Sequence, residues 1–98
     1  LQIKSDLFVS STEGVTLFEA KAGGSKAEDL YQLRMYHDGC IADDMEVREA
    51  VLIARRHPDT VRALLAELNR QKDKKGRPYH FALTTWDEEG IVLPPDAA

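Results

Sequence analysis

The stretch Val15-Thr-Leu-Phe-Glu-Ala-Lys21 decides the fold of this chain. Its first four residues are good strand formers, and glycines precede and follow it, so it is predicted to form a β-strand. Successive side chains of a strand point to opposite faces, so Glu19 and Lys21 share one face. A carboxylate and an ammonium therefore lie side by side at the end of a hydrophobic run.

A second hydrophobic stretch, Leu1 to Val9, is predicted to form another strand, and it carries Asp6. Small polar residues over Ser10 to Gly14 predict a turn, and a turn this short joins antiparallel strands. We therefore expect Asp6 to approach Glu19. Two carboxylates beside a lysine suit a divalent cation, because hard cations prefer oxygen ligands.

A loop with two glycines follows Lys21 and leads into a predicted helix from Lys26 to His37. Ser25 is the expected N-cap, with Glu28 as its partner in a capping box. The dipeptide Asp38-Gly39 is expected to end the helix.

At these residues the chain resembles a known superfamily. Asp6 followed by Glu19-Ala20-Lys21 resembles the core motif of the PD-(D/E)XK nucleases. Gln32-Leu-Arg-Met-Tyr36 resembles the Q-x-x-x-Y motif of their RecB-like branch, and its two end residues lie four apart, on one helix face. The chain departs from the pattern in two respects. Ser5 stands where the family has proline, and an upstream helix that often carries a further acidic residue is absent.

The resemblance implies a restriction-endonuclease-like α/β fold over residues 1–98, with a mixed sheet of about four to five strands flanked by two helices. It implies a Mg²⁺ or Mn²⁺ ion held by Asp6, Glu19 and the carbonyl group of Ala20, and hydrolysis of phosphodiester bonds. Lys21 would orient the attacking water or stabilise charge on the phosphate. Gln32 and Tyr36 would reach the same centre and contact a phosphate or a base.

The rest of the chain continues the alternation of strands and helices. The run Glu49 to Arg55 is continuously apolar in its middle, which predicts a central strand. A helix is expected to open at His57 to Thr60, with a buried stripe at helical spacing formed by Val61, Leu64, Leu65 and Leu68. A polar loop over Lys72 to Pro78, a strand over Tyr79 to Trp86 and a short strand over Gly90 to Leu93 complete the prediction.

Basic residues supply candidate contacts to a nucleic-acid backbone. The net charge of −4 argues against a protein that coats nucleic acid, but a nuclease needs only a local basic patch. Lys26 and Arg34 on the first helix are candidates. A denser group follows the second helix and consists of Arg70, Lys72, Lys74, Lys75 and Arg77.

Composition limits the setting. The chain has 98 residues, enough for one domain, and its one cysteine, Cys40, excludes an internal disulfide framework. No apolar run approaches a membrane span, and a reducing cytoplasm is the expected compartment. Because the chain begins at Leu1 within a predicted strand, we expect a fragment of a larger protein that lacks an N-terminal helix.

Alternatives stay open at this point. Taken singly, the charges can be structural, with Glu19 and Lys21 as a solvated pair and Asp6 paired with Lys4. The first hypothesis is a metal-dependent nuclease domain that acts on nucleic acid, with DNA favoured, in repair, recombination or defence. The second is an inactive domain of this fold that binds nucleic acid or assembles a complex. The third is an interaction module whose exposed strand edge pairs with a second copy of itself, as a homodimer, or with a partner.

Overall fold

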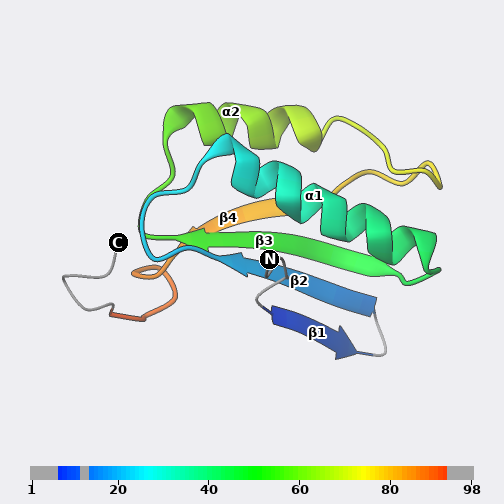
Figure 1. Ribbon diagram of the computed structural model, residues 1–98, viewed down its shortest axis with the longest axis horizontal. Helices are drawn as coiled ribbons and strands as arrows, with labels where there is room; N and C mark the ends of the chain where they lie inside the picture. Colours follow the sequence, from blue (N-terminus) through cyan, green and yellow to red (C-terminus); the bar gives the residue numbers. More distant parts are fainter. Residues whose placement is uncertain (1–6, 12–13, 93–98) are drawn as a thin grey trace.

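The computed structural model describes residues 7–11 and 14–92 and contains six elements in this part of the chain (Figure 1). They are β1 (Leu7–Ser11), β2 (Gly14–Ala20), α1 (Ala27–Ala42), β3 (Val47–Ala54), α2 (Asp59–Leu68) and β4 (Phe81–Thr85). The predicted α/β class with two helices is confirmed. None of the described helices is long and apolar enough to cross a membrane.

The strands form one sheet in the order β1-β2-β3-β4. The neighbours β2, β3 and β4 are parallel and are joined by the two helices, whereas β1 pairs antiparallel with β2 at the edge. In the β1–β2 pair Leu7 lies opposite Phe18 and Ser11 opposite Gly14, so strand pairing extends into the predicted turn. β3 is central, as its apolar run predicted.

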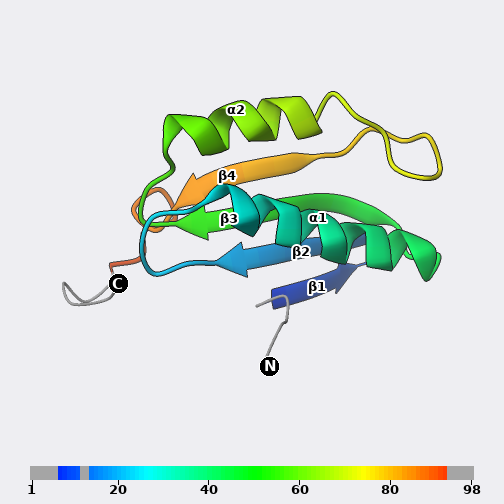
Figure 2. The same cartoon turned by 45° about the horizontal axis from the view of Figure 1, so that its top comes forward.

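Both helices lie over the same face of the sheet and pack against each other (Figure 2). This follows from the topology, because two consecutive right-handed crossovers that advance in one direction place their helices on one side. The carboxyl ends of the parallel strands, with the β2–α1 and β3–α2 loops, therefore lie together at one end of the molecule. The loop between α2 and β4 lies at the opposite end (Figure 1).

The core lies between the helices and the sheet. Burial alternates along β2, so Val15, Leu17 and Glu19 face the helices. The largest fully buried side chains come from both layers and are Leu17, Leu30, Leu33, Leu52, Val61 and Leu68. Each such side chain stabilises the fold by about 1.5–3 kcal/mol relative to an exposed position.

The prediction that Asp38-Gly39 ends the first helix is wrong, since α1 continues to Ala42. Gly39 is exposed, and a glycine within a helix costs only about 1 kcal/mol relative to alanine. Burial of Ile41, which is 3 % exposed, more than offsets that cost. The helix ends at Ala42 with Asp43 as its C-cap, and the next residue, Asp44, has a φ of 61° in the left-handed region that often follows helices.

Two further expectations differ from the structure. Ser25 does not cap α1, because the N-cap is Lys26 and its N–H donates to Asp29 Oδ2 at 2.8 Å. The short strand predicted from Gly90 is absent over Gly90–Val92, where the chain forms a turn in which the Ile91 N–H donates to the Trp86 carbonyl at 2.8 Å. Leu93 lies outside the described residues.

Candidate functional site

Glu19 and Lys21 lie where the sequence placed them, at the carboxyl end of β2 on the face covered by the helices. Glu19 is buried, with 6 % of its surface exposed. Lys21 follows the last residue of β2, and its N–H donates to the Ile53 carbonyl at 2.8 Å, which keeps the strand geometry for one more residue. The two charged groups thus have fixed positions at the end of a strand.

A carboxylate that sequence reasoning missed holds the lysine in place. Asp29, in the first turn of α1, has a side chain that is only 6 % exposed, and its Oδ1 lies 3.6 Å from Lys21 Nζ. Its other oxygen accepts the N–H of Lys26. Asp29 therefore caps the helix and orients the lysine at once. The signal in the sequence was its place three residues after Lys26, but Ser25 and Glu28 gave an equally plausible capping box.

Gln32 and Tyr36 share a face of α1, as predicted, and Gln32 Nε2 donates to Tyr36 Oη at 3.4 Å. Gln32 lines a cavity of about 490 Å³, here called the Gln32 cavity, together with Lys21, Lys26, Glu28, Asp29 and Met35. Tyr36 instead packs against the hydrophobic core. The structure thus brings Gln32 to Lys21 and places Tyr36 deeper in the fold.

The donor groups for a divalent cation are present in part. The Glu19 carboxylate and the Ala20 carbonyl are hard oxygen donors of the kind that Mg²⁺ and Mn²⁺ take. Asp6, the second predicted carboxylate, lies outside the described residues. Among residues 7–11 and 14–92, no group of three or more His, Cys, Asp or Glu residues could hold a metal ion. The predicted donor set therefore depends on Asp6.

A second cavity, of about 530 Å³, lies between the β2–α1 and β3–α2 loops. We call it the Arg56 cavity, and residues 20–26, Arg56 and Pro58 line it. The two loops are joined by backbone hydrogen bonds, from the Ser25 N–H to the Arg56 carbonyl at 3.0 Å and from the Arg55 N–H to the Gly23 carbonyl at 2.9 Å. Lys21 and Lys26 line both this cavity and the Gln32 cavity.

A buried histidine, His57, holds one residue of the cavity lining, Ser25, against β4. His57 Nε2 lies 2.6 Å from the Thr84 carbonyl, which can only accept, so Nε2 carries a proton. In the neutral ring, Nδ1 then accepts the hydroxyl proton of Ser25, whose Oγ is 2.7 Å away. Ser25 is 3 % exposed and His57 is 7 % exposed. Sequence reasoning treated His57 as a helix-entry residue, because nothing local reveals a partner that lies 32 positions away.

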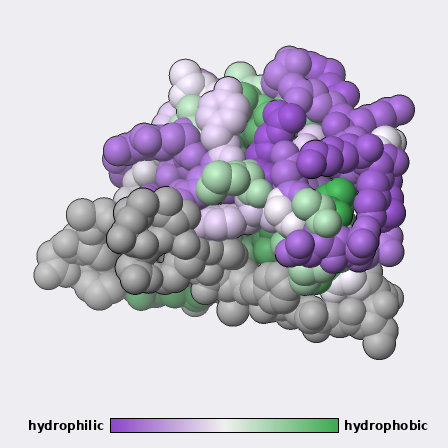
Figure 3. Space-filling model, turned by 45° about the vertical axis from the view of Figure 1, so that its right-hand side comes forward, coloured by the Kyte–Doolittle hydropathy of each residue, from purple (hydrophilic) through white to green (hydrophobic). Residues whose placement is uncertain are grey.

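The predicted basic loop lies at the other end of the sheet, beyond the amino ends of β3 and β4 (Figure 1). Lys75 Nζ lies 2.9 Å from Asp44 Oδ1, and Arg77 Nη1 lies 2.9 Å from Glu46 Oε2. Lys72 and Lys74 are exposed, and Arg70 pairs with Glu67. The structure does not bring this loop to Lys21. The view with this end turned forward shows a mostly hydrophilic surface over the coloured residues (Figure 3).

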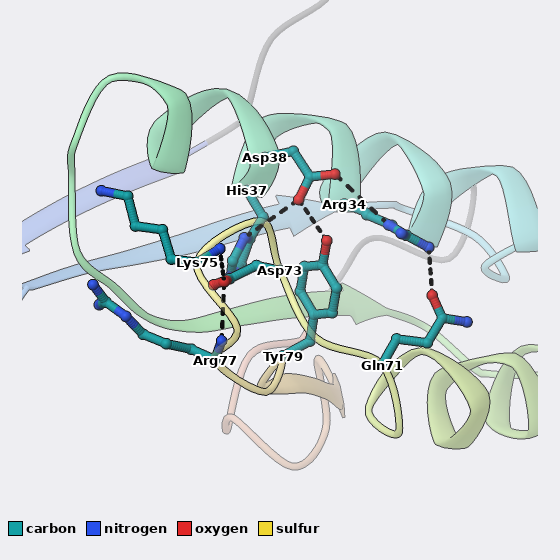
Figure 4. A network of polar contacts seen from close by, with 8 residues as sticks. All are labelled: Arg34, His37, Asp38, Gln71, Asp73, Lys75, Arg77 and Tyr79. Atoms are coloured by element: carbon teal, nitrogen blue, oxygen red, sulfur yellow. Dashed lines mark hydrogen bonds and ion pairs between the residues drawn. The ribbon is translucent and has the colours of Figure 1, made fainter.

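Arg34, which was predicted to contact the nucleic-acid backbone, belongs to a polar network at the same end (Figure 4). It donates to Gln71 Oε1 at 3.0 Å, pairs with Asp38 at 3.7 Å, and lies over the ring of Tyr79. Tyr79 Oη donates to Asp38 Oδ1 at 2.6 Å. Burial raises the pKa of Tyr79, and the hydrogen bond to Asp38 adds to this effect. Arg34 is thus engaged in holding α1 to the α2–β4 loop.

His37 is the second buried histidine, and it lies within this network. Its ring contacts Tyr79 edge-on, with the ring centroids 4.8 Å apart. Within the described residues its Nδ1 has no hydrogen-bond partner. Burial lowers the pKa of His37, although Asp38 and Asp73 act in the opposite direction. The imidazole of His37 therefore takes up a proton less readily than an exposed imidazole does.

Asp73 organises the turn of the basic loop itself. Its Oδ1 accepts the backbone N–H of Lys75 at 2.8 Å and that of Arg77 at 3.1 Å. Burial by itself would raise the pKa of Asp73. These hydrogen bonds act in the opposite direction, and the net pKa lies below the ordinary value. The loop that carries the cations is thus shaped by a carboxylate of its own.

Comparison with known proteins gives no match: no model of a protein family, no curated protein and no solved structure is similar to this chain.

Proposed function

We propose that this chain is a metal-dependent nuclease domain that hydrolyses phosphodiester bonds of nucleic acid, with a restriction-endonuclease-like fold. One observation carries the proposal. Glu19 and Lys21 share the buried face at the carboxyl end of β2, and Gln32 of α1 lines a cavity with that lysine. The residues of two separate sequence motifs therefore meet at one place, which independent structural roles would not require.

The arrangement of strands supports the same proposal. Leu7 directly follows Asp6 in the sequence and pairs with Phe18, the residue before Glu19. We propose that this antiparallel register continues by one residue, which would place Asp6 opposite Glu19. We propose that Asp6, Glu19 and the Ala20 carbonyl hold one Mg²⁺ or Mn²⁺ ion, which would acidify water and neutralise negative charge during hydrolysis.

The remaining residues have roles that follow from their positions. The ammonium of Lys21 is fixed by Asp29 yet 42 % exposed, so it can orient the attacking water or donate to a phosphate oxygen. The amide of Gln32 lines the same cavity and can position either group by hydrogen bonds. Tyr36 accepts a hydrogen bond from Gln32 and so fixes the orientation of that amide.

The test is a cleavage assay on labelled single- and double-stranded DNA and RNA, with Mg²⁺, with Mn²⁺ and with EDTA. We expect cleavage that requires the metal, with loss of cleavage in Glu19→Gln. Lys74→Met, which removes an exposed cation at the far end of the sheet, is the control and should cleave as wild type does. Absence of cleavage of all four substrates, with either metal, would refute the catalytic proposal.

A further inference from the structure

We propose that the Arg56 cavity binds a phosphate group of the nucleic acid, adjacent to the phosphate that is cleaved. The identity of the ligand as nucleic acid rests on the proposed function, whereas the capacity to bind phosphate rests on the cavity alone. Neither sequence motif includes Arg56 or Lys26, but Ala20 and Lys21 of the first motif line the same cavity, so the proposed site adjoins the proposed catalytic centre.

The charge of the cavity favours an anion. Three cations line it, Lys21, Lys26 and Arg56, and among the described residues its lining contains no Asp or Glu. Lys21 shares its charge with Asp29. Within the described residues, the side chains of Lys26 and Arg56 form no ion pair with a carboxylate. Two positive charges in this hollow are therefore available to a ligand.

The guanidinium of Arg56 lies against Gly24 of the β2–α1 loop. A Cβ atom at that glycine would be 3.3 Å from both Cζ and Nε of Arg56, so a larger residue there would crowd the arginine. The glycine thus lets the guanidinium lie close to the loop. A planar guanidinium can donate two parallel hydrogen bonds to a phosphate.

The floor of the cavity is rigid before any ligand binds. Ser25 is tied to His57, and His57 to Thr84 of β4. Trp86 Nε1 donates to the Lys21 carbonyl at 2.8 Å, and the two loops share backbone hydrogen bonds. A preformed site loses little conformational entropy on binding, which favours affinity for a small group such as a phosphate.

Two helices add to the positive potential. The helix α1 begins at Ala27, after Lys26, and α2 begins at Asp59, after Pro58, and both preceding residues line the cavity. The amino end of a helix carries partial positive charge from its aligned peptide groups. Both helices therefore add to the potential that the three side chains create.

The neighbouring Gln32 cavity has a different character, because Glu28 and Asp29 line it as well. Lys21 lies at the boundary and contacts both hollows. A polyanion whose phosphate occupies the Arg56 cavity would therefore present its next phosphate to Lys21. This geometry assigns the Arg56 cavity to substrate positioning beside the proposed metal centre, since Ala20, whose carbonyl is a proposed ligand, lines the same cavity.

The test measures binding of a fluorescent oligonucleotide in EDTA, where cleavage cannot occur, at several salt concentrations. Arg56→Gln should weaken binding about tenfold, because one charge-assisted contact is lost. It should also reduce the slope of log affinity against log salt by about 0.7–0.9. Arg77→Gln, which removes an arginine already paired with Glu46, is the matched control and should bind within about twofold of wild type.

A second probe is inorganic phosphate, followed through the amide signals of Gly23 and Gly24 in nuclear magnetic resonance spectra. Phosphate should shift both signals in wild type and in Arg56→Lys, but not in Arg56→Gln. Oligonucleotide affinity and salt slope that are equal in wild type and Arg56→Gln would overturn the proposal. So would a wild type that responds to phosphate but binds no oligonucleotide.

The two proposals fail in different ways. Cleavage that depends on Glu19 together with unchanged binding by Arg56→Gln would refute only the phosphate site. Loss of binding in Arg56→Gln, with no cleavage by the wild type, would support the phosphate site and refute only the nuclease.

Discussion

Each end of the parallel sheet carries a group of basic residues, and the two groups differ in their partners. At the amino end Lys75 and Arg77 face the carboxylates of Asp44 and Glu46. At the carboxyl end Arg56 and Lys26 line a cavity to which residues 7–11 and 14–92 contribute no carboxylate. The sequence is denser in cations at the first end, but Asp44 and Glu46 pair with two of those cations. At the second end Lys26 and Arg56 line one cavity and form no ion pair with a carboxylate of the described residues. Attraction for a phosphate depends on unpaired charge gathered in one place and not on the number of cations.

The two ends also differ in how their buried histidines are held. Both ring nitrogens of His57, at the carboxyl end, have hydrogen-bond partners. His37, at the other end, packs among aromatic rings, and its Nδ1 has no hydrogen-bond partner within the described residues. We interpret the first as a strut that positions loops and the second as part of the core.

The largest effect is expected for Lys21→Met. If the carboxyl end is catalytic, loss of this ammonium removes stabilisation of the charge that develops on the phosphate, and kcat should fall by about 10²–10³-fold. Single-turnover cleavage rates measure this directly. Lys74→Met at the opposite end should leave the rate unchanged, and an equal loss in both variants would erase the distinction between the ends.

A smaller effect on stability should separate the two histidines. His57→Phe leaves the Ser25 hydroxyl and the Thr84 carbonyl without their partner and should lower the free energy of unfolding by about 2–4 kcal/mol. His37→Phe exchanges one ring for another beside Tyr79 and Phe81 and should cost less than about 1.5 kcal/mol near pH 7.5. Urea denaturation of both variants gives the comparison, and the reverse order would contradict our interpretation.

The pH dependence of stability should follow His37. Because its pKa in the folded state lies below 6.5, the unfolded chain binds a proton more readily, and stability is lost as the pH falls below about 6.5. The groups that influence this ring are Asp38, Asp73 and His80. In His37→Phe the loss of stability between pH 7.5 and pH 5.5 should be smaller than in wild type. An identical loss in both proteins would exclude His37 as its source.

The smallest effect is expected when the amino end is stripped of its carboxylates. Asp44→Asn combined with Glu46→Gln frees Lys75 and Arg77, so affinity for an oligonucleotide at low salt should rise a few-fold. The salt slope should steepen by at most about 2, one for each released cation. Fluorescence anisotropy in EDTA measures both quantities. An unchanged affinity and salt slope would mean that pairing with Asp44 and Glu46 does not limit binding by Lys75 and Arg77.

Much of the fold could be predicted from local pattern. The strand ending at Ala20 and the second helix have clear hydrophobic periodicity, and the central strand is a continuous apolar run. The end of α1 could not, because Gly39 is an unfavourable residue whose cost is offset by tertiary burial of Ile41. Propensity is local, whereas that packing is not.

The candidate site divides in the same way. Glu19, Lys21 and Gln32 belong to short motifs, and the structure brings Lys21 and Gln32 to one cavity. Asp29, His57 and Arg56 were missed because their roles arise from neighbours in space, such as Lys21, Ser25 and Gly24. The basic loop shows the opposite case. Its cations are adjacent in sequence, but Asp44 and Glu46, which neutralise two of them, come from the α1–β3 loop.

The most direct test of the central claim is a calorimetric titration of Mn²⁺ into wild type, Asp6→Ala, Glu19→Gln and Lys21→Met. We predict one binding event in wild type that disappears when either carboxylate is removed and persists in Lys21→Met, which keeps both carboxylates. Binding that is unchanged in both carboxylate variants, or no binding in the wild type, would contradict a metal centre at the carboxyl end of β2.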